Sequence, residues 1–293
     1  MDYVLLSLRE ARLVRQRTSL LLRLHNELQD DTNPDAIHDL RVASRRMREV
    51  LDYLRNSLPE KWYNRLMNSS KKITKSLGHL RETEENLKLI GDFRDDGKID
   101  SISAEILIHA QKKALKKGKQ KSMRRVSESK FSTFEKFFSR VRGSRITLPT
   151  VSDMLELRMQ DFVSFTWSTT INDDHLHDLR IRAKKLRYAM EIHERVTGRR
   201  MGRLRSRLKK LQETLGHIHD LFVLSEFVRQ AKEEWNDPDS KVVFASLHET
   251  YEFVLSQKLD LYPRVYPMYS KIVSAIAPPT HVDLPEASPA MVN

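Results

Sequence analysis

The amino-acid sequence predicts an all-α fold made of two four-helix bundles, related by an internal pseudo-twofold axis that a tandem duplication would produce. The first observation behind this prediction is composition. Only 8 of the 293 residues are glycine, while Leu, Lys, Arg, Glu and Met are plentiful, and this balance favours helix over sheet. The second observation is periodicity, because apolar residues recur at intervals of three and four and neither half alternates as strands would.

The third observation is an internal repeat. Residues 38–48 have the sequence HDLRVASRRMR, and residues 177–187, which lie 139 positions later, have the sequence HDLRIRAKKLR. Residues 77–80 (LGHL) correspond in the same way to residues 215–218 (LGHI), at an offset of 138. Solenoid repeats are about 20–50 residues long, so a repeat of this length indicates a duplicated domain.

The first half of the chain is predicted to hold four helices, over residues 3–29, 34–57, about 61–90 and about 100–139. Asn33 followed by Pro34 is typical of an N-cap and a first helical position, and Pro59 should stop this second helix. Residues 91–97 are predicted to form a loop. Gly118 is a candidate break in the fourth helix.

The second half repeats the pattern, with helices predicted over residues 150–170, 173–196, 200–232 and 239–261. Asn172 corresponds to Asn33, so the N-cap is expected to repeat as well. Residues 142–149 resemble a linker. The predicted organisation is therefore a first half over residues 1–145, a second half over 146–277 and a disordered tail over 278–293.

Composition also limits the function. The formal net charge is +12 and the isoelectric point is about 9.8, which favours a nucleic acid, an acidic membrane surface or another polyanion as partner. The chain has no cysteine, so disulfides, thiolate catalysis and Cys-type zinc sites are excluded. It shows no signal peptide and no run of about 18 apolar residues, so a cytoplasmic protein without a membrane span is expected.

A row of cations follows one face of the second predicted helix. On a helical wheel His38, Arg41, Arg45 and Arg48 fall within about 80° of one another, opposite the apolar residues. The row is about 15 Å long at 1.5 Å per residue. The second half repeats this row with His177, Arg180, Lys184 and Arg187.

The third helices carry similar rows. The first consists of Arg65, Lys72, Lys75 and His79, and the second consists of Arg203, Arg207, Lys210 and His217. Tyr188 is an aromatic residue beside the cations of the second half. If adjacent helices place their rows side by side, each half presents a continuous basic surface. A pseudo-twofold axis could then place the two basic surfaces on opposite sides of one groove.

A row of like charges has two interpretations. It can be a solvated surface, or it can bind an anion. Like charges at i, i+3 and i+4 repel one another by a few tenths of a kcal/mol per pair, and solvated faces usually mix signs. Few acids interrupt these rows, the rows occur twice, and each begins with His, which favours an anion site. Because the rows contain almost no aromatic residues, a phosphate chain without bases fits them better than a nucleic acid does.

Several alternatives stay open from the residues alone. The histidines could contact the ligand or be structural. Nucleic-acid binding is the first alternative function. A metal-dependent phosphohydrolase is the second, because the His-Asp dipeptides are typical of helical enzymes of that class, although the cations beside them would repel a divalent metal. The run of eight cations from Lys112 to Arg125 is interpreted as a solvated helix face with at most an accessory electrostatic role.

These residues resemble the CHAD family, the conserved histidine α-helical domain. Its pattern is a His-x-x-Arg helix with a basic continuation, found twice and followed by third helices that contain Leu-Gly. Residues 38–48 and 177–188 both match this pattern, and the resemblance covers roughly residues 3–277. Glu82 stands where the family has Asp after an Arg, and the second half has His219-Asp220 there instead.

The resemblance implies two four-helix bundles that bind inorganic polyphosphate in a basic central groove. It also implies targeting to polyphosphate granules. We therefore expect a non-catalytic binding protein, with no catalytic residue, cofactor or metal. Its binding residues would be His38, Arg41, Arg45, Arg48, His177, Arg180, Lys184 and Arg187.

Overall fold

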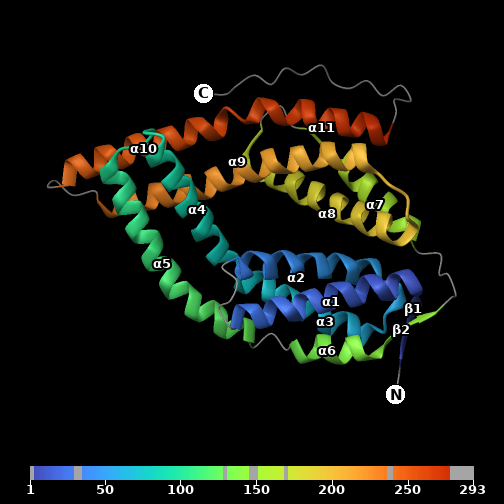
Figure 1. The fold of residues 1–293 in the computed structure, drawn as a ribbon. Helices are drawn as coiled ribbons and strands as arrows, with labels where there is room; N and C mark the ends of the chain where they lie inside the picture. Colours follow the sequence, from blue (N-terminus) through green and yellow to red (C-terminus); the bar gives the residue numbers. More distant parts are fainter. Residues whose placement is uncertain are drawn as a thin grey trace. The chain divides into compact units, whose positions relative to one another are not determined.

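The computed structural model describes residues 3–29, 35–127, 131–144, 151–167, 171–235 and 240–277. The first part of the chain forms β1 (Val4–Ser7), α1 (Leu8–Gln29), α2 (Ala36–Tyr53), the 3-10 helix η1 (Arg55–Ser57), α3 (Glu60–Ser76), α4 (Gly78–Asp95), α5 (Ser101–Ser127), α6 (Phe131–Arg140) and β2 (Val141–Ser144). The second part forms α7 (Val151–Val163), α8 (Asp173–Thr197), α9 (Gly202–Glu234), α10 (Lys241–Leu259) and α11 (Tyr262–Ile276). The predicted all-α class is confirmed (Figure 1).

The chain folds into two compact units. The described residues of 1–81, 116–157 and 188–201 form unit 1, and those of 82–115, 158–187 and 202–293 form unit 2. This division differs from the predicted halves over 1–145 and 146–277, because residues 82–115 fold with the C-terminal helices. The pseudo-twofold relation stays a prediction.

Unit 1 is built around α1 and α2. Helix α2 packs against α1 and α3, and α6 packs against both α1 and α3 (Figure 1). The apolar faces of these helices form the core, whose fully buried side chains include Leu21, Leu40, Met47, Leu51, Leu66, Ile73, Phe134 and Phe137. The core face predicted for the second helix is therefore confirmed, and the cation row lies on the other side of α2.

A two-stranded parallel sheet, absent from the sequence prediction, lies against α1 in unit 1. Strand β1 pairs with β2 in the register Val4↔Val141 to Ser7↔Ser144. Residues 142–144, predicted as the start of a linker, thus belong to a strand. Gly143 permits this packing, because a Cβ at that position would lie 2.8 Å from Leu8 Cδ2. The sheet fixes the beginning of α1 five residues later than predicted.

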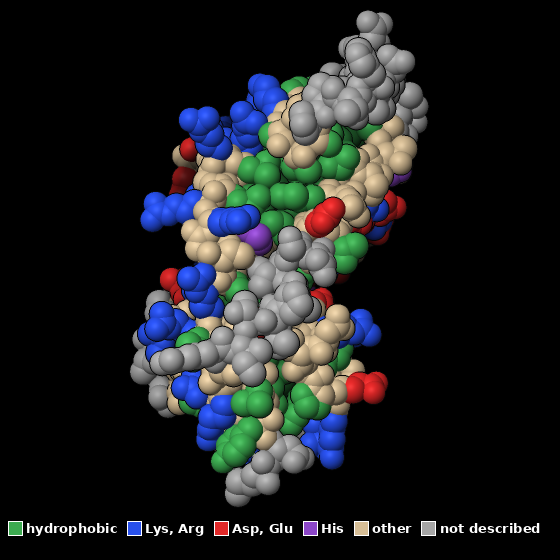
Figure 2. All heavy atoms as spheres, turned by 90° about the vertical axis from the view of Figure 1, so that its right-hand side faces the viewer, with side chains coloured by type: hydrophobic (Ala, Val, Ile, Leu, Met, Phe, Trp, Pro, Cys, Tyr) green, Lys and Arg blue, Asp and Glu red, His purple; other side chains and the backbone are tan. Residues whose placement is uncertain are grey.

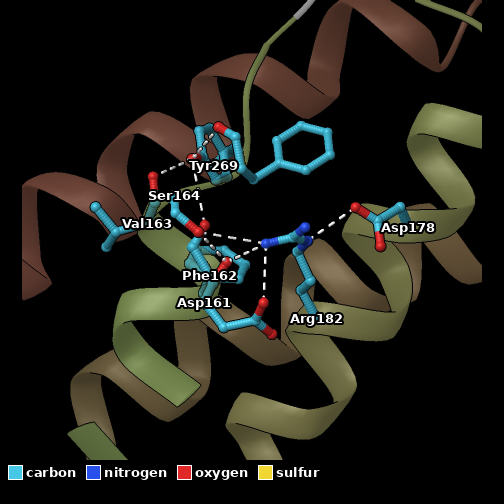
Figure 3. A network of polar contacts seen from close by, with 8 residues as sticks. Asp161, Phe162, Val163, Ser164, Asp178, Arg182 and Tyr269 are labelled. Atoms are coloured by element: carbon cyan, nitrogen blue, oxygen red, sulfur yellow. Dashed lines mark hydrogen bonds and ion pairs between the residues drawn. The ribbon is translucent and has the colours of Figure 1, made fainter. Parts of the chain in front are cut away.

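Unit 2 is built around α9, against which α10 and α11 pack (Figure 1). Residues of α4 and α5 join α9 and α10 in a shared apolar core, whose members include Ile90, Ala104, Leu107, Leu221, Leu224, Val228, Leu247 and Val254. Helix α11, which the sequence analysis did not assign, is held by Tyr269. Its single hydroxyl donor lies within hydrogen-bond distance, 3.1–3.3 Å, of the carbonyl oxygens of Phe162, Val163 and Phe165 (Figure 3).

Other predicted boundaries change. The third predicted helix is two helices, because a turn at Leu77 separates α3 from α4. The predicted loop at 91–97 is mostly helical, since α4 continues to Asp95 and turns at Gly97, whose φ is +67°. Helix α5 continues through Gly118 without a break, but a separate α6 follows it.

The repeated N-cap is confirmed in the second half, where Asn172 Oδ1 accepts a hydrogen bond from the His175 backbone N–H at 2.9 Å. The predicted cap at Asn33-Pro34, the rest of the linker and the tail over 278–293 lie outside the described residues.

Candidate anion-binding site

Unit 1 carries the first basic face on α2 and α3. His38, Arg41, Arg45 and Arg48 are half-buried on α2, whereas Arg65, Lys72 and Lys75 are exposed on α3, and His79 is exposed in the first turn of α4. We call these eight residues the α2–α3 face. Because α3 packs against α2, the two predicted rows lie on neighbouring helices.

Unit 2 carries the second basic face on α8 and α9. Arg180, Lys184 and Arg187 are half-buried on α8 and His177 is exposed, while Arg203, Arg207, Lys210 and His217 are exposed on α9. We call these residues the α8–α9 face. The two helices are in contact, because Gln212 Nε2 of α9 donates to the Ala183 carbonyl of α8.

Half-burial distinguishes the α2 and α8 rows from an ordinary solvated surface. The Nε of Arg48 is buried and has no hydrogen-bond partner among the described atoms. A guanidinium in partly dehydrated surroundings interacts with an added anion more strongly than one in bulk water, because the effective dielectric constant is lower. Each row therefore combines surface access with partial desolvation.

Two candidate residues differ from the rest. Tyr188 is only 6% exposed and lies in unit 1, so its ring is part of the interior and not of the α8–α9 face. Arg207 Nη1 donates to the Lys271 carbonyl of α11 at 3.3 Å, so this cation also links α9 to α11.

The first histidine of each motif has the same kind of surroundings in both units. Burial lowers the pKa of His38 below 6.5, and Arg81 and Arg41 lower it further. His177 is exposed at the surface, but partial desolvation by the surrounding protein also lowers its pKa, and Arg180 and Lys184 add to this effect. Both imidazoles are therefore mostly neutral at pH 7 and can each donate one hydrogen bond.

The sequence analysis missed position 81 and its counterpart 219, both of which influence these histidines. Arg81 acts electrostatically on His38, and the rings of His177 and His219 have centroids 5.3 Å apart. The signal was available, because Arg81 and His219 correspond at the same offset as the Leu-Gly pairs. In unit 2 the two imidazoles border a hollow of about 250 Å³, which Arg180, Asp173 and Asp174 also line.

Other cations of the repeated motif stabilise the fold instead. Arg182 Nε donates to Asp178 Oδ2 at 2.8 Å, and its Nη1 donates to Asp161 Oδ1 at 2.9 Å and to the Asp161 carbonyl, which ties α8 to α7 (Figure 3). In unit 1, Arg46 Nε lies 3.8 Å from Glu191, which Arg17 also approaches. These pairs compensate the charge of cations that point away from the candidate rows.

The surface has the charge that the composition predicts. Figure 2 shows one face of the molecule, on which many Lys and Arg side chains reach the surface. Within the part of the chain that the structure describes, no group of three or more His, Asp or Glu residues could hold a metal ion. None of the described helices is long and apolar enough to cross a membrane.

Comparison with known proteins identifies the fold. A family model described as the CHAD domain matches residues 12–229. The chain belongs to the CHAD domain family. This family is associated with polyphosphate binding. No curated protein matches the sequence.

Two solved structures share the CHAD fold. PptA from Streptomyces chartreusis superimposes with a TM-score of 0.69 at 14% identity, covering 90% of this chain and 97% of PptA. The CHAD domain of the plant Ricinus communis gives a TM-score of 0.65 at 15% identity and covers 93% of both chains. At such low identity these similarities establish the fold alone.

Proposed function

We propose that this CHAD protein binds inorganic polyphosphate through the α2–α3 and α8–α9 faces and catalyses no reaction. The observation that carries the proposal is the pair of half-buried cation rows, which occur on corresponding helices of the two repeats. Membership of the CHAD family supports polyphosphate as the anion.

The residue types suit a chain of phosphates. Arg can donate two parallel hydrogen bonds to phosphate oxygens, whereas Lys acts as a point charge. Each half-buried row supplies three such cations at intervals of three and four residues, flanked by exposed cations on the next helix. Counterions bound to the polyanion are released when the protein binds. The affinity for polyphosphate should therefore decrease as the salt concentration increases.

A single long chain contacts both faces in this proposal, and the resulting affinity recruits the protein to polyphosphate granules. The neutral histidines add directed hydrogen-bond donors at the beginning of each row, and they gain charge in acid.

The decisive experiment reverses one charge in each row. We expect Arg41→Glu with Arg180→Glu to lose most polyphosphate affinity, because each substitution removes one cation and adds one repulsive anion. A matched control is Arg199→Glu with Arg264→Glu, since both of these arginines are exposed and lie outside the two faces. Titration calorimetry with long-chain polyphosphate measures the affinity of both variants and of the wild type, and the two variants are compared at equal net charge.

Three outcomes would contradict the proposal. If the Arg41/Arg180 variant binds as well as the control, the rows are a solvated surface. If single-stranded RNA displaces polyphosphate from the wild type at equal phosphate concentration, the faces bind nucleic acid instead. Phosphate release from polyphosphate that requires an added divalent metal would contradict the absence of catalysis.

A further inference from the structure

The second half of α5 is a strongly basic surface outside the two faces. After Glu105 the helix contains no acidic residue, and its exposed cations are Lys112, Lys113, Lys116, Lys117, Lys119, Lys121, Arg124 and Arg125. Like charges at i, i+3 and i+4 destabilise a helix by a few tenths of a kcal/mol per pair. The cations of this run therefore repel one another along the helix, and a bound polyanion would relieve that repulsion.

Four of these cations share one side of the helix and a hollow. Lys117, Lys121, Arg124 and Arg125 follow at i, i+4, i+7 and i+8, and with Gln120 they line an open hollow of about 570 Å³. We call these four residues the α5 basic face. It lies within unit 1, as the α2–α3 face does.

The packing at Gly118 places α5 against the first turn of α4, beside His79 at one end of the α2–α3 face. A Cβ built at Gly118 would lie 3.0 Å from Leu80 Cδ2 and 3.8 Å from His79 Cδ2. The glycine thus lets α5 approach the first turn of α4, where His79 completes the row that begins on α3. Cations flank this contact directly, at Lys117 and Lys119.

The second repeat has no equivalent surface. At the offset of 139, the four positions of the α5 basic face correspond to Ser256, Asp260, Pro263 and Arg264, of which only one is a cation. Helix α10 also contains Glu249 and Glu252, and its Lys258 is buried in an ion pair with Asp173 at 2.8 Å. The extension of the basic surface is therefore a property of unit 1 alone.

We propose that the α5 basic face is an additional binding surface for long polyphosphate, which it contacts beyond the part of the chain held by the α2–α3 face. The inference rests on the proposed function and adds to it a preference for long chains. Three points favour polyphosphate over RNA at this surface. It contains no aromatic residue on which bases could stack, its Lys and Arg side chains are both suited to phosphate oxygens, and α5 packs beside His79 of the α2–α3 face, which is proposed to bind the same anion.

The test replaces the four cations by glutamine, in Lys117→Gln, Lys121→Gln, Arg124→Gln and Arg125→Gln. Glutamine has a helix propensity close to those of Lys and Arg, so α5 should stay helical, and circular dichroism checks this. The matched control is Lys88→Gln, Arg199→Gln, Lys241→Gln and Arg264→Gln, which removes the same charge from exposed positions elsewhere. The affinity of each protein is measured at several salt concentrations with three probes. These are polyphosphate of about ten phosphates, polyphosphate of about one hundred phosphates, and single-stranded RNA.

We expect the α5 variant to lose about tenfold or more in affinity for the long chain and to bind the short chain as the wild type does. With up to four phosphate contacts removed, the slope of log K against log salt for the long chain should fall by about 3, if single-stranded nucleic acid is a guide. Equal losses in the α5 and control variants, or equal losses for both chain lengths, would overturn the inference. So would a loss of RNA binding with unchanged long-chain affinity.

Failure of the proposed function would look different. If the wild type binds neither polyphosphate, both proposals fail together. If the Arg41/Arg180 variant binds both chains normally while the α5 variant loses the long chain, the site proposed on the two faces is wrong and the α5 basic face is the principal binding surface.

Discussion

Some corresponding positions of the two repeats hold arginine in both halves, whereas another holds arginine in one half and lysine in the other. Arg41 and Arg180 correspond, and so do Arg48 and Arg187, so arginine occupies these positions in both halves. Arg45 instead corresponds to Lys184. Because only Arg can donate two parallel hydrogen bonds to one phosphate, the positions with arginine in both halves are those where geometry should matter in addition to charge.

This difference can be tested without changing net charge. We expect Arg41→Lys with Arg180→Lys to weaken polyphosphate binding about three- to thirtyfold, because up to two charge-assisted hydrogen bonds of about 1 kcal/mol each lose their geometry. Arg45→Lys, the matched control, should bind as the wild type does. The salt dependence should be the same in all three proteins, and titration calorimetry at several salt concentrations would show it. Equal affinities for the two lysine variants would mean that the rows act by charge alone.

The histidines should make binding depend on pH. The pKa values of His38 and His177 are lowered in the free protein, so their charge appears only as the pH falls below 6.5. Polyphosphate favours the charged form, and affinity should therefore rise as the pH falls from 7.5 to 5.5, by about fivefold per histidine if charging adds about 1 kcal/mol to each hydrogen bond.

The variant His38→Gln with His177→Gln should remove most of this rise. His248→Gln is the control, because His248 is exposed and lies 3.9 Å from Glu252, outside both faces. Polyphosphate titrations at several pH values would measure the effect. A pH dependence that the double variant retains in full would assign the two histidines a structural role.

At the scale of elements, periodicity predicted most of the helical segments, but it missed α11 and did not show where neighbouring segments break or pair. The Leu-Gly-His tripeptide occurs twice, yet α3 ends just before it at Ser76, while α9 runs straight through it to Glu234. The same local sequence thus gives two outcomes, so tertiary packing must decide between them. The two strands were also missed. Each has only four residues, and its pairing partner is 137 positions away, so no local sequence pattern indicates the pair.

The candidate site could be predicted only where it depends on a single helix, and not where it depends on contacts between helices. A helical wheel places Arg41, Arg45 and Arg48 on one side of α2 without any knowledge of neighbours. It cannot show that Arg81 lowers the pKa of His38 or that Tyr188 is buried, because both depend on other helices. It also cannot separate Arg182, which is bound to Asp161 and Asp178, from the cations of the row.

Arg182 should be a stabilising residue of α8 and not a ligand contact. We expect Arg182→Met to lower the free energy of unfolding by about 1–2 kcal/mol, because Asp161 and its carbonyl lose a partly exposed charged donor (Figure 3). Urea denaturation would measure this change. Arg229→Met is the control, since its pairs with Glu226 and Glu233 are exposed and should not contribute measurably. Reduced polyphosphate affinity in fully folded Arg182→Met would contradict the assignment.

At the scale of the whole molecule, the question is whether one polyphosphate chain uses both faces. When a second contact follows the first on the same chain, it forms at an effective concentration set by the chain, and overall affinity exceeds that of either face by about 10²–10⁴. Two faces that bind separate chains give no such gain. The two cases differ in stoichiometry as well as in affinity, so they can be separated by removing one face at a time.

Two variants make this comparison. One carries Arg41→Gln, Arg45→Gln and Arg48→Gln, and the other carries Arg180→Gln, Lys184→Gln and Arg187→Gln. If one chain uses both faces, each variant should lose about a hundredfold or more in affinity for long polyphosphate while the stoichiometry remains one chain per protein. If the faces act separately, each variant should keep the affinity of the intact face and lose one of two binding events. Short chains provide the internal control, because a chain that reaches only one face should bind each variant at its intact face with unchanged affinity. Loss of all short-chain binding in either variant would show that the two rows form one indivisible site.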